Sequence, residues 1–252
     1  MKILFNKNGE SLFLDEERHH VIHGKRKIDI SPGFVISAGS TVRLEKNSYL
    51  ILDPGPSILK SVARRGPQII DPRDAAVMMM YSDMKQDSRI LESGTGSGFL
   101  TSMILRYLSP DGSYLGIDQS TDSIEITRKN VGLTTDRKIE IVNMRFEEFD
   151  GMGRVFDCVF LDLPEPWASI SSQRKYIVPG GRVVTYLPNY DQVERAVLEY
   201  ERNGFYHFET DEILKREIIV RENATRPSST GVMHTAFISC FIRKDGSEII
   251  LS

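Results

Sequence analysis

The chain has few cysteines, no long apolar run and almost no excess of charge. Its two cysteines, Cys158 and Cys240, lie inside apolar stretches, which indicates buried thiols and excludes a disulfide framework. No apolar run approaches the ~20 residues that a membrane helix needs. The apolar start at Met1 is too short to predict a signal peptide. We therefore expect a cytoplasmic protein with no membrane contact.

The charge balance also excludes one class of function. The chain carries 32 basic and 35 acidic residues, a net charge of −3, which argues against coating of nucleic acid by global charge. A local basic surface remains compatible with this balance, because binding depends on where the charges lie. The length of 252 residues fits one large domain or two small ones.

Residues 1–55 have the texture of a small antiparallel β domain. Short apolar runs alternate there with turn-forming pieces such as Asn8-Gly9 and Ser31-Pro32-Gly33. Residues 56–71 are expected to be a linker that holds a short helix over Ile58–Arg65.

The histidines at 19, 20 and 23 lack a complete ligand set, so we expect no metal site.

From residue 72 to residue 252, strand and helix patterns alternate, which predicts a parallel sheet covered by helices. The chain then ends with two long apolar runs, Tyr206–Arg221 and Val232–Arg243, that leave no room for a helix between them, so we expect an antiparallel pair. The earlier strands are expected at 89–92, 114–118, 139–144, 155–161 and 182–186, and the helices at 72–84, 99–108, 120–131, 168–177 and 192–202. This is the pattern of a Rossmann-like α/β domain.

A glycine-rich loop follows the first of these strands. The loop comprises Gly94, Thr95, Gly96, Ser97 and Gly98, preceded by Glu92. A dinucleotide fingerprint would require glycine at the position of Phe99. The spacing E-x-G-x-G-x-G instead resembles motif I of S-adenosylmethionine-dependent methyltransferases. That resemblance implies S-adenosylmethionine as cofactor, with Glu92 near the amino end of its methionine part.

Other strand ends supply further candidate cofactor contacts. Asp118, followed by Gln119, closes the next strand, where a carboxylate can accept both ribose hydroxyls of a nucleoside. Met144 and Arg145 close the third strand, where the methyltransferases that the loop resembles have their adenine pocket. Asp162 is also expected to lie beside the cofactor.

The turn Asp162-Leu163-Pro164-Glu165-Pro166-Trp167 follows a strand that reads as fully buried. Its two prolines stop the strand and stiffen the turn, because each lacks an N–H and fixes its own φ. A carboxylate and an aromatic ring are thus held at a ligand-binding sheet edge. This arrangement suits a flat substrate that forms hydrogen bonds, such as a nucleobase.

Together these motifs resemble the tRNA (adenine-58-N1)-methyltransferase family in its archaeal and bacterial single-subunit form. Four segments carry the resemblance: Gln68–Asp74, the loop Glu92–Gly98, Asp162–Trp167, and Arg226-Pro227 with His234–Phe237. The resemblance implies a class I methyltransferase with a seven-stranded, mostly parallel sheet, and a homotetramer. The sequence departs from the family at Asp71, where a tyrosine is common, and at Met233, where a glycine is common.

The family implies methylation of adenine N1 in the T-loop of tRNA, with Asp162, Trp167 and His234 as candidate catalytic residues. Asp162 would accept a hydrogen bond from the N6 amino group and offset the charge that forms on the ring. For tRNA binding we single out four arginines that could hold phosphates: Arg64, Arg65, Arg73 and Arg226.

Three alternatives remain open at this point. The same fold could methylate a small molecule or a protein carboxylate, since fold does not prove substrate. Methylation of an adenine amino group uses a related turn, but Leu163 separates Asp162 from Pro164 here. A non-catalytic tRNA-binding subunit is the third alternative, and an eroded glycine loop would favour it.

Overall fold

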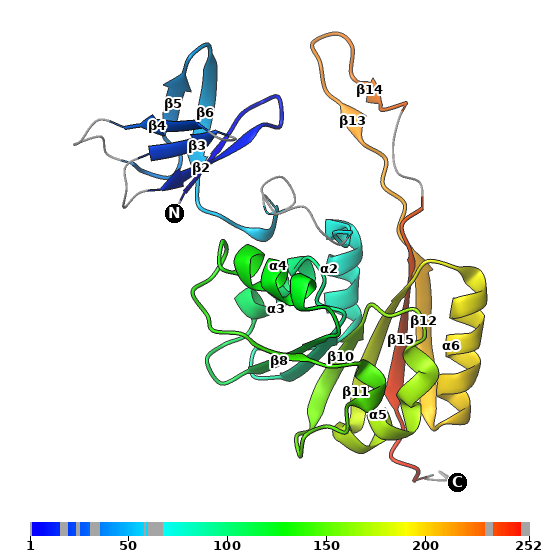
Figure 1. Ribbon diagram of the computed structural model, residues 1–252. Helices are drawn as coiled ribbons and strands as arrows, with labels where there is room; N and C mark the ends of the chain where they lie inside the picture. Colours follow the sequence, from blue (N-terminus) through cyan, green and yellow to red (C-terminus); the bar gives the residue numbers. More distant parts are fainter. Residues whose placement is uncertain are drawn as a thin grey trace.

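The residues that the structure describes form two large sheets, one in each part of the chain, and a two-stranded sheet in a projecting hairpin (Figure 1). The structure, a computed structural model, describes residues 2–15, 20–23, 26–30, 36–57, 59, 68–229 and 234–247. Within these residues, no helix combines the length and the apolar character that crossing a bilayer requires. Of the helix expected over 58–65, the structure describes only Leu59, and His19, Arg64 and Arg65 lie outside the described residues.

The N-terminal part is an antiparallel sheet, as the alternating runs predicted; it has six strands in the order β4-β3-β2-β1-β6-β5. Leu4, Leu14, Val21 and Ile51 are buried in its small core. The strands are β1 (Lys2–Phe5), β2 (Ser11–Asp15), β3 (His20–His23), β4 (Arg26–Asp29), β5 (Thr41–Leu44) and β6 (Asn47–Leu52).

The second part forms a seven-stranded sheet in the order β12-β15-β11-β10-β7-β8-β9. The pairs from β11 to β9 are parallel, and β15 is antiparallel to both of its neighbours. This confirms the expected Rossmann-like sheet. Its strands are β7 (Arg89–Ser93), β8 (Ser113–Asp118), β9 (Glu140–Asn143), β10 (Phe156–Leu161), β11 (Ile177–Leu187), β12 (Phe205–Glu212) and β15 (Phe237–Arg243).

Helices cover both faces of this sheet, which explains why β10 is apolar at successive positions. Cys158 and Phe160 join the core on one face, with residues of α2 (Pro72–Tyr81), α3 (Phe99–Tyr107) and α4 (Thr121–Val131). Val159 and Leu161 join the core on the other face, beneath α5 (Ile170–Tyr176) and α6 (Tyr190–Arg202).

The C-terminal pair differs from the expectation in length. β12 ends at Glu212 and β15 begins at Phe237, so neither strand has the length that its apolar run predicted. The chain between them leaves the sheet as a projecting hairpin with two short strands, β13 (Ile218–Ile219) and β14 (Arg226–Pro227) (Figure 1). Beyond Glu212 the chain therefore no longer pairs with β15; Ile218 pairs only with Pro227 of the hairpin, and Leu214, Ile218 and Val220 are exposed.

The strand order reverses beside β7. The strand that follows it in sequence, β8, lies on one side, and β10 lies on the other. In open α/β sheets, ligands bind at the carboxyl ends of the strands where the order reverses. The ends of β7 and β10 are the glycine loop and Asp162, so both sequence motifs lie at this point.

Candidate active site

The glycine loop adopts a backbone conformation with positive φ angles, which glycine permits. Gly94, Gly96 and Gly98 have φ values of +84°, +50° and +75°, a region that side chains with a Cβ rarely adopt. At Gly94 a Cβ would also lie 2.3 Å from the carbonyl oxygen of Asp162. The missing side chain thus lets the loop after β7 cross directly over the end of β10.

Asp118 holds this loop in place. Its Oδ2 accepts hydrogen bonds from the Gly96 N–H at 3.1 Å and the Thr95 hydroxyl at 3.4 Å. Its Oδ1 accepts from the Ser120 N–H at 2.9 Å, so the carboxylate joins the loop to the start of α4. Asp118 is buried but lines a cavity, which agrees with a carboxylate directed at a ligand.

Two cavities adjoin the loop, and Gly94, Gly96 and Asp162 line both of them. The larger has a volume of about 470 Å³ and the smaller about 120 Å³. Of the predicted cofactor residues, the larger is lined by Gly94, Gly96, Asp118, Gln119, Met144, Arg145 and Asp162, and the smaller by Glu92, Gly94, Thr95, Gly96, Ser97 and Asp162. Gly98 lines neither and instead begins α3 as its N-cap.

Asp162 faces both cavities from a rigid turn. The backbone N–H of Asp162 donates to the Ser93 carbonyl at 3.0 Å, and this hydrogen bond holds Asp162 beside the start of the glycine loop. The side chain is open to the cavities, but the surrounding protein removes part of its hydration. This loss of hydration, with a smaller effect from Asp118, raises the pKa of Asp162 to about 6.

Glu92 lies beneath the loop with only 2% of its surface exposed. The hydroxyls of Thr101 and Tyr114 donate to its Oε2 at 2.8 and 2.7 Å. Burial raises the pKa of Glu92 to about 8, despite these two donors, and the carboxylates of Asp162 and Asp118 contribute to the increase.

The other two candidate catalytic residues, Trp167 and His234, line neither of the two cavities. Trp167 lies in the short helix η2 (Pro166–Ser169), next to Pro166, where that helix begins. Its side chain is half-buried and packs under α6, and the guanidinium of Arg195 lies over its ring, 4.8 Å from the ring centre. His234 is hydrogen-bonded through Nδ1 to Glu212 Oε1 and through Nε2 to the Pro188 carbonyl at 2.9 Å. Both partners are acceptors, and the hydrogen bond to Glu212 raises the pKa of His234 because it stabilises the protonated ring.

Two of the four basic candidates, Arg73 and Arg226, lie within the described residues. The guanidinium of Arg73 pairs with Asp71 Oδ1 at 2.6 Å and reaches the Ile213 carbonyl at 3.4 Å. Arg226 is exposed on the projecting hairpin. Asp71, the departure from the family pattern, is the N-cap of α2, where its side chain accepts from the Arg73 N–H at 3.1 Å.

Sequence reasoning missed one pair beside the site. Leu161 is in register with Thr185, so Tyr186 on β11 is the neighbour of Asp162 across the parallel pair. The Tyr186 hydroxyl donates to the fully buried Asp74 in the first turn of α2, at 3.0 Å. The only local signal was an acid in the first turn after Pro72, where the helix dipole stabilises a carboxylate.

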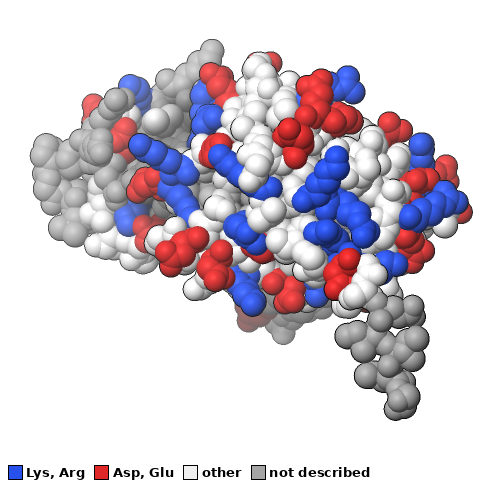
Figure 2. Space-filling model, turned by 90° about the horizontal axis from the view of Figure 1, so that it is seen from below, with Lys and Arg blue, Asp and Glu red and all other residues white. Residues whose placement is uncertain are grey.

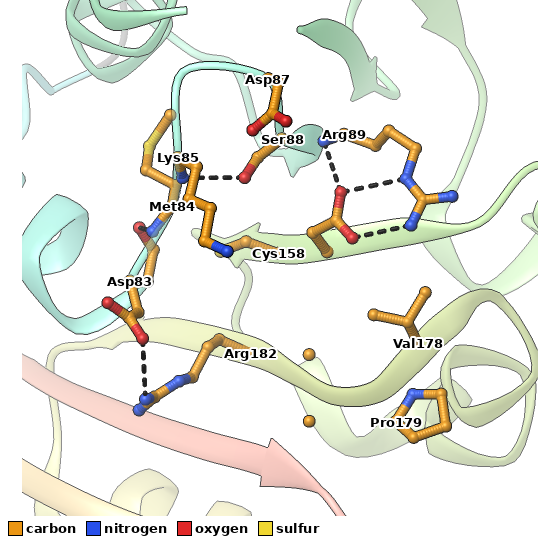
Figure 3. A pocket seen from close by; sticks show the side chains of 14 residues that line it. Asp83, Met84, Lys85, Asp87, Ser88, Arg89, Cys158, Val178, Pro179 and Arg182 are labelled. Atoms are coloured by element: carbon orange, nitrogen blue, oxygen red, sulfur yellow. Dashed lines mark hydrogen bonds and ion pairs between the residues drawn. The ribbon is translucent and has the colours of Figure 1, made fainter.

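A third cavity, of about 460 Å³, lies at the opposite edge of the sheet, where β7 and β10 begin. Arg89 forms a two-point ion pair there with Asp157, and Arg182 reaches Asp83 at 3.4 Å (Figure 3). The underside of the molecule shows the same mixture of basic and acidic side chains (Figure 2). Because these charges neutralise one another, we do not assign the active site to this edge.

The described residues contain no cluster of three or more side chains able to hold a metal ion.

The sheet order, the glycine loop and the strand-end carboxylate at one pair of cavities together define a class I S-adenosylmethionine-dependent methyltransferase. Two solved structures share the fold. An S-adenosylmethionine-dependent O-methyltransferase from Thermotoga maritima has a TM-score of 0.84 and 23% identity, over 98% of this chain and 94% of that one. The tRNA (m1A58) methyltransferase TrmI from Aquifex aeolicus has a TM-score of 0.80 and 23% identity, over 98% of both chains.

The chain belongs to the family described as the tRNA methyltransferase complex GCD14 subunit, whose model matches residues 48–237. Among curated relatives, the tRNA (adenine(57)-N(1)/adenine(58)-N(1))-methyltransferase TrmI of Methanocaldococcus jannaschii is 29% identical over 217 residues, 76% of this chain and 77% of that protein. The tRNA (adenine(58)-N(1))-methyltransferase TrmI of Thermus thermophilus is 31% identical over 172 residues, 66% of each chain. These relatives confirm the family that the four sequence segments indicated.

Proposed function

We propose that this protein transfers a methyl group from S-adenosylmethionine to N1 of adenine 58 in the T-loop of tRNA. The observation that carries the proposal is the position of Asp162, which lines both cavities at the strand-order reversal of a GCD14-family chain. The intact glycine loop favours a catalytic chain over a non-catalytic tRNA-binding subunit.

The two joined cavities fit the proposed cofactor. The larger has room for a nucleoside, with Asp118 as a ribose acceptor and Met144 and Arg145 also in its lining. The smaller fits an amino-acid end, with Glu92 in its wall. When bound, S-adenosylmethionine supplies a methyl group that is activated by its positively charged sulfur.

Asp162 is the proposed catalytic residue. The target adenine must leave its stack to expose N1, and a carboxylate beside the loop would hold the N6 amino edge of the extruded base. The same carboxylate stabilises the positive charge that appears on the ring as N1 is methylated. N1 has a free lone pair, so Asp162 does not have to act as a strong base first.

Three other side chains support this arrangement in our proposal. Tyr186, hydrogen-bonded to Asp74, follows Thr185 on β11 and so neighbours Asp162 across the strand pair, where it would support the turn. Trp167 holds the proline turn against α6, and His234 links the ends of β12, β11 and β15 through its two hydrogen bonds. Trp167 and His234 thus act on the pocket by positioning its walls.

For tRNA binding we keep the four arginines at positions 64, 65, 73 and 226 as phosphate contacts. Arg226 has the most direct support, because it is exposed on the projecting hairpin. The exposed Leu214, Ile218 and Val220 on the same hairpin support contact with a second copy of the chain, as in the proposed homotetramer. A tRNA substrate would place the protein in the cytoplasm.

The division of the chain is part of the same proposal. Residues 1–55 would form a separate β domain that contributes to oligomerisation or tRNA contact. Residues 56–71 would be the linker, and residues 72–252 the methyltransferase domain.

The test is incubation with methyl-labelled S-adenosylmethionine and an unmodified tRNA transcript, followed by mapping of the methylated base. A transcript with guanine at position 58 is the matched control. Label at N1 of adenine 58, absent from the control transcript, is the expected result. Label on another base, on the adenine amino group or on a small molecule would overturn the proposed substrate.

A further inference from the structure

The arginines in the second part of the chain differ in whether the protein itself already binds their guanidinium groups. Among the described residues from 68 to 247, every arginine outside the projecting hairpin pairs with a carboxylate or donates to a main-chain carbonyl. Arg154, for example, forms two hydrogen bonds with Glu140, each of 2.9 Å. Arg137 donates to the carbonyls of Leu108 and Gly112 at 2.9 and 2.6 Å. A phosphate would have to displace such partners before it could bind these arginines.

The projecting hairpin, described over residues 213–229, is the exception. Within the described residues, the guanidinium groups of Arg216 and Arg221 have no partner. That of Arg226 reaches only the carbonyl of its neighbour Pro227, at 3.4 Å. All three arginines are exposed, and the hairpin carries four basic and two acidic side chains, whereas the whole chain has a net charge of −3. The hairpin is therefore a local basic surface on a chain of nearly balanced charge.

This hairpin begins and ends at the sheet edge that carries the proposed catalytic carboxylate. β12 ends at Glu212 and β15 begins at Phe237, at the edge where β10 and β11 also end. The guanidinium of Arg73 donates to the Ile213 carbonyl at 3.4 Å and so ties the root of the hairpin to α2. Because an extended strand rises about 3.3 Å per residue, the chain from Ile213 to Arg221 reaches up to about 25 Å from this edge (Figure 1).

We propose that the projecting hairpin grips the sugar–phosphate backbone of the tRNA next to the extruded nucleotide, with Arg216, Arg221 and Arg226 binding phosphates. This inference rests on the proposed tRNA substrate and adds the surface that holds it. A guanidinium group presents a planar set of donors that matches two phosphate oxygens. Phosphate contacts position a nucleic acid without reading its sequence, so the hairpin orients the tRNA while Asp162 selects the base.

A strand of RNA fits these arginines better than a second copy of the chain does. Several acids that a second copy would present are already paired with its own arginines, among them Glu140, Asp157 and Glu199. RNA instead carries a negative charge at every nucleotide, so it supplies several anionic partners along one projecting hairpin at once.

The proposal predicts how the affinity for tRNA depends on salt. Each phosphate that a basic side chain neutralises adds about 0.7–0.9 to the negative slope of log K against log salt concentration. Replacement of the three arginines by glutamine should therefore reduce this slope by about 2–3, and each single replacement by about 1. The reduction should be the same for a transcript with guanine at position 58, because phosphate contacts do not read the base.

The experiment measures binding of the full chain to an unmodified tRNA transcript by fluorescence anisotropy at a series of salt concentrations. Arg221→Gln is compared with Arg202→Gln, which removes the same charge from an exposed side chain at the end of α6, at the opposite edge of the sheet. The triple variant at 216, 221 and 226 gives the full effect. Sedimentation of each sample reports its oligomeric state. The midpoint of urea unfolding reports its fold and should match wild type, because the replaced side chains are exposed.

We expect the slope to fall by about 1 in Arg221→Gln and by about 2–3 in the triple variant, with Arg202→Gln equal to wild type. A triple variant with the wild-type slope would overturn the inference, and so would an equal loss in Arg202→Gln. A changed oligomeric state with an unchanged slope would overturn it in favour of contact between copies. In each of these cases the proposed function stands if the wild type methylates adenine 58. Failure of the wild type to bind or methylate tRNA would instead overturn the proposed function itself.

Discussion

Substitution of Gly94 by alanine tests whether the close crossing of the loop over Asp162 builds the site. A new Cβ would lie 2.3 Å from the Asp162 carbonyl oxygen, so the two segments must separate by more than 1 Å to reach ordinary contact. The positive φ of +84° adds about 1–2 kcal/mol of backbone strain. With about 1–3 kcal/mol for overpacking, we expect the free energy of unfolding to fall by about 2–5 kcal/mol.

Gly153→Ala is the matched control, because Gly153 also has a positive φ, of +70°, but a Cβ there would meet no atom within 4 Å. This control should lose only the strain part, about 1–2 kcal/mol, in urea denaturation. Folded Gly94→Ala should also show methyl transfer slowed by about 100-fold, since a 1 Å displacement at a reacting centre has effects of that size. Equal stability of the two variants, with normal transfer by Gly94→Ala, would refute the reasoning.

Three further predictions concern Asp162 and two residues near the site. Tyr186→Phe removes the hydroxyl that donates to buried Asp74 and should lower the free energy of unfolding by about 1–3 kcal/mol in urea denaturation; an unchanged midpoint would contradict this. Asp71→Ala removes the N-cap of α2 and the ion pair with Arg73 and should cost about 1 kcal/mol, whereas Asp71→Asn should retain most of the cap; equal losses would argue against capping. The rate of methyl transfer should fall as pH drops below about 6, because protonation removes the negative charge of Asp162, and a rate constant independent of pH from 5 to 8 would exclude that requirement.

The parts of the site that follow from local sequence could be predicted. The glycine spacing and the double-proline turn each constrain their own backbone, and both follow apolar runs that read as strands. Parallel strands place their carboxyl ends at one edge, so Asp118 and Asp162 were expected there before any contact was known. The structure brings both to the larger cavity.

What the sequence could not reveal depends on partners that are distant in the chain. Asp74 and Tyr186 are 112 positions apart, and only the packing of α2 against β11 brings them together. The same holds for Trp167 and His234, whose surroundings on α6, β12 and the β11–α6 loop direct them away from the cavities. The C-terminal strands were predicted too long because apolar content does not tell whether a neighbouring strand is available for pairing.

The most direct test of the central claim is single-turnover methyl transfer to the tRNA transcript by Asp162→Asn, with binding of S-adenosylmethionine measured on the same sample. Asp191→Asn, which removes an exposed carboxylate in the first turn of α6, is the control. We predict a rate at adenine 58 about 100- to 1000-fold below wild type, with cofactor affinity within about threefold and the control unchanged. A near-normal rate in Asp162→Asn would contradict the account.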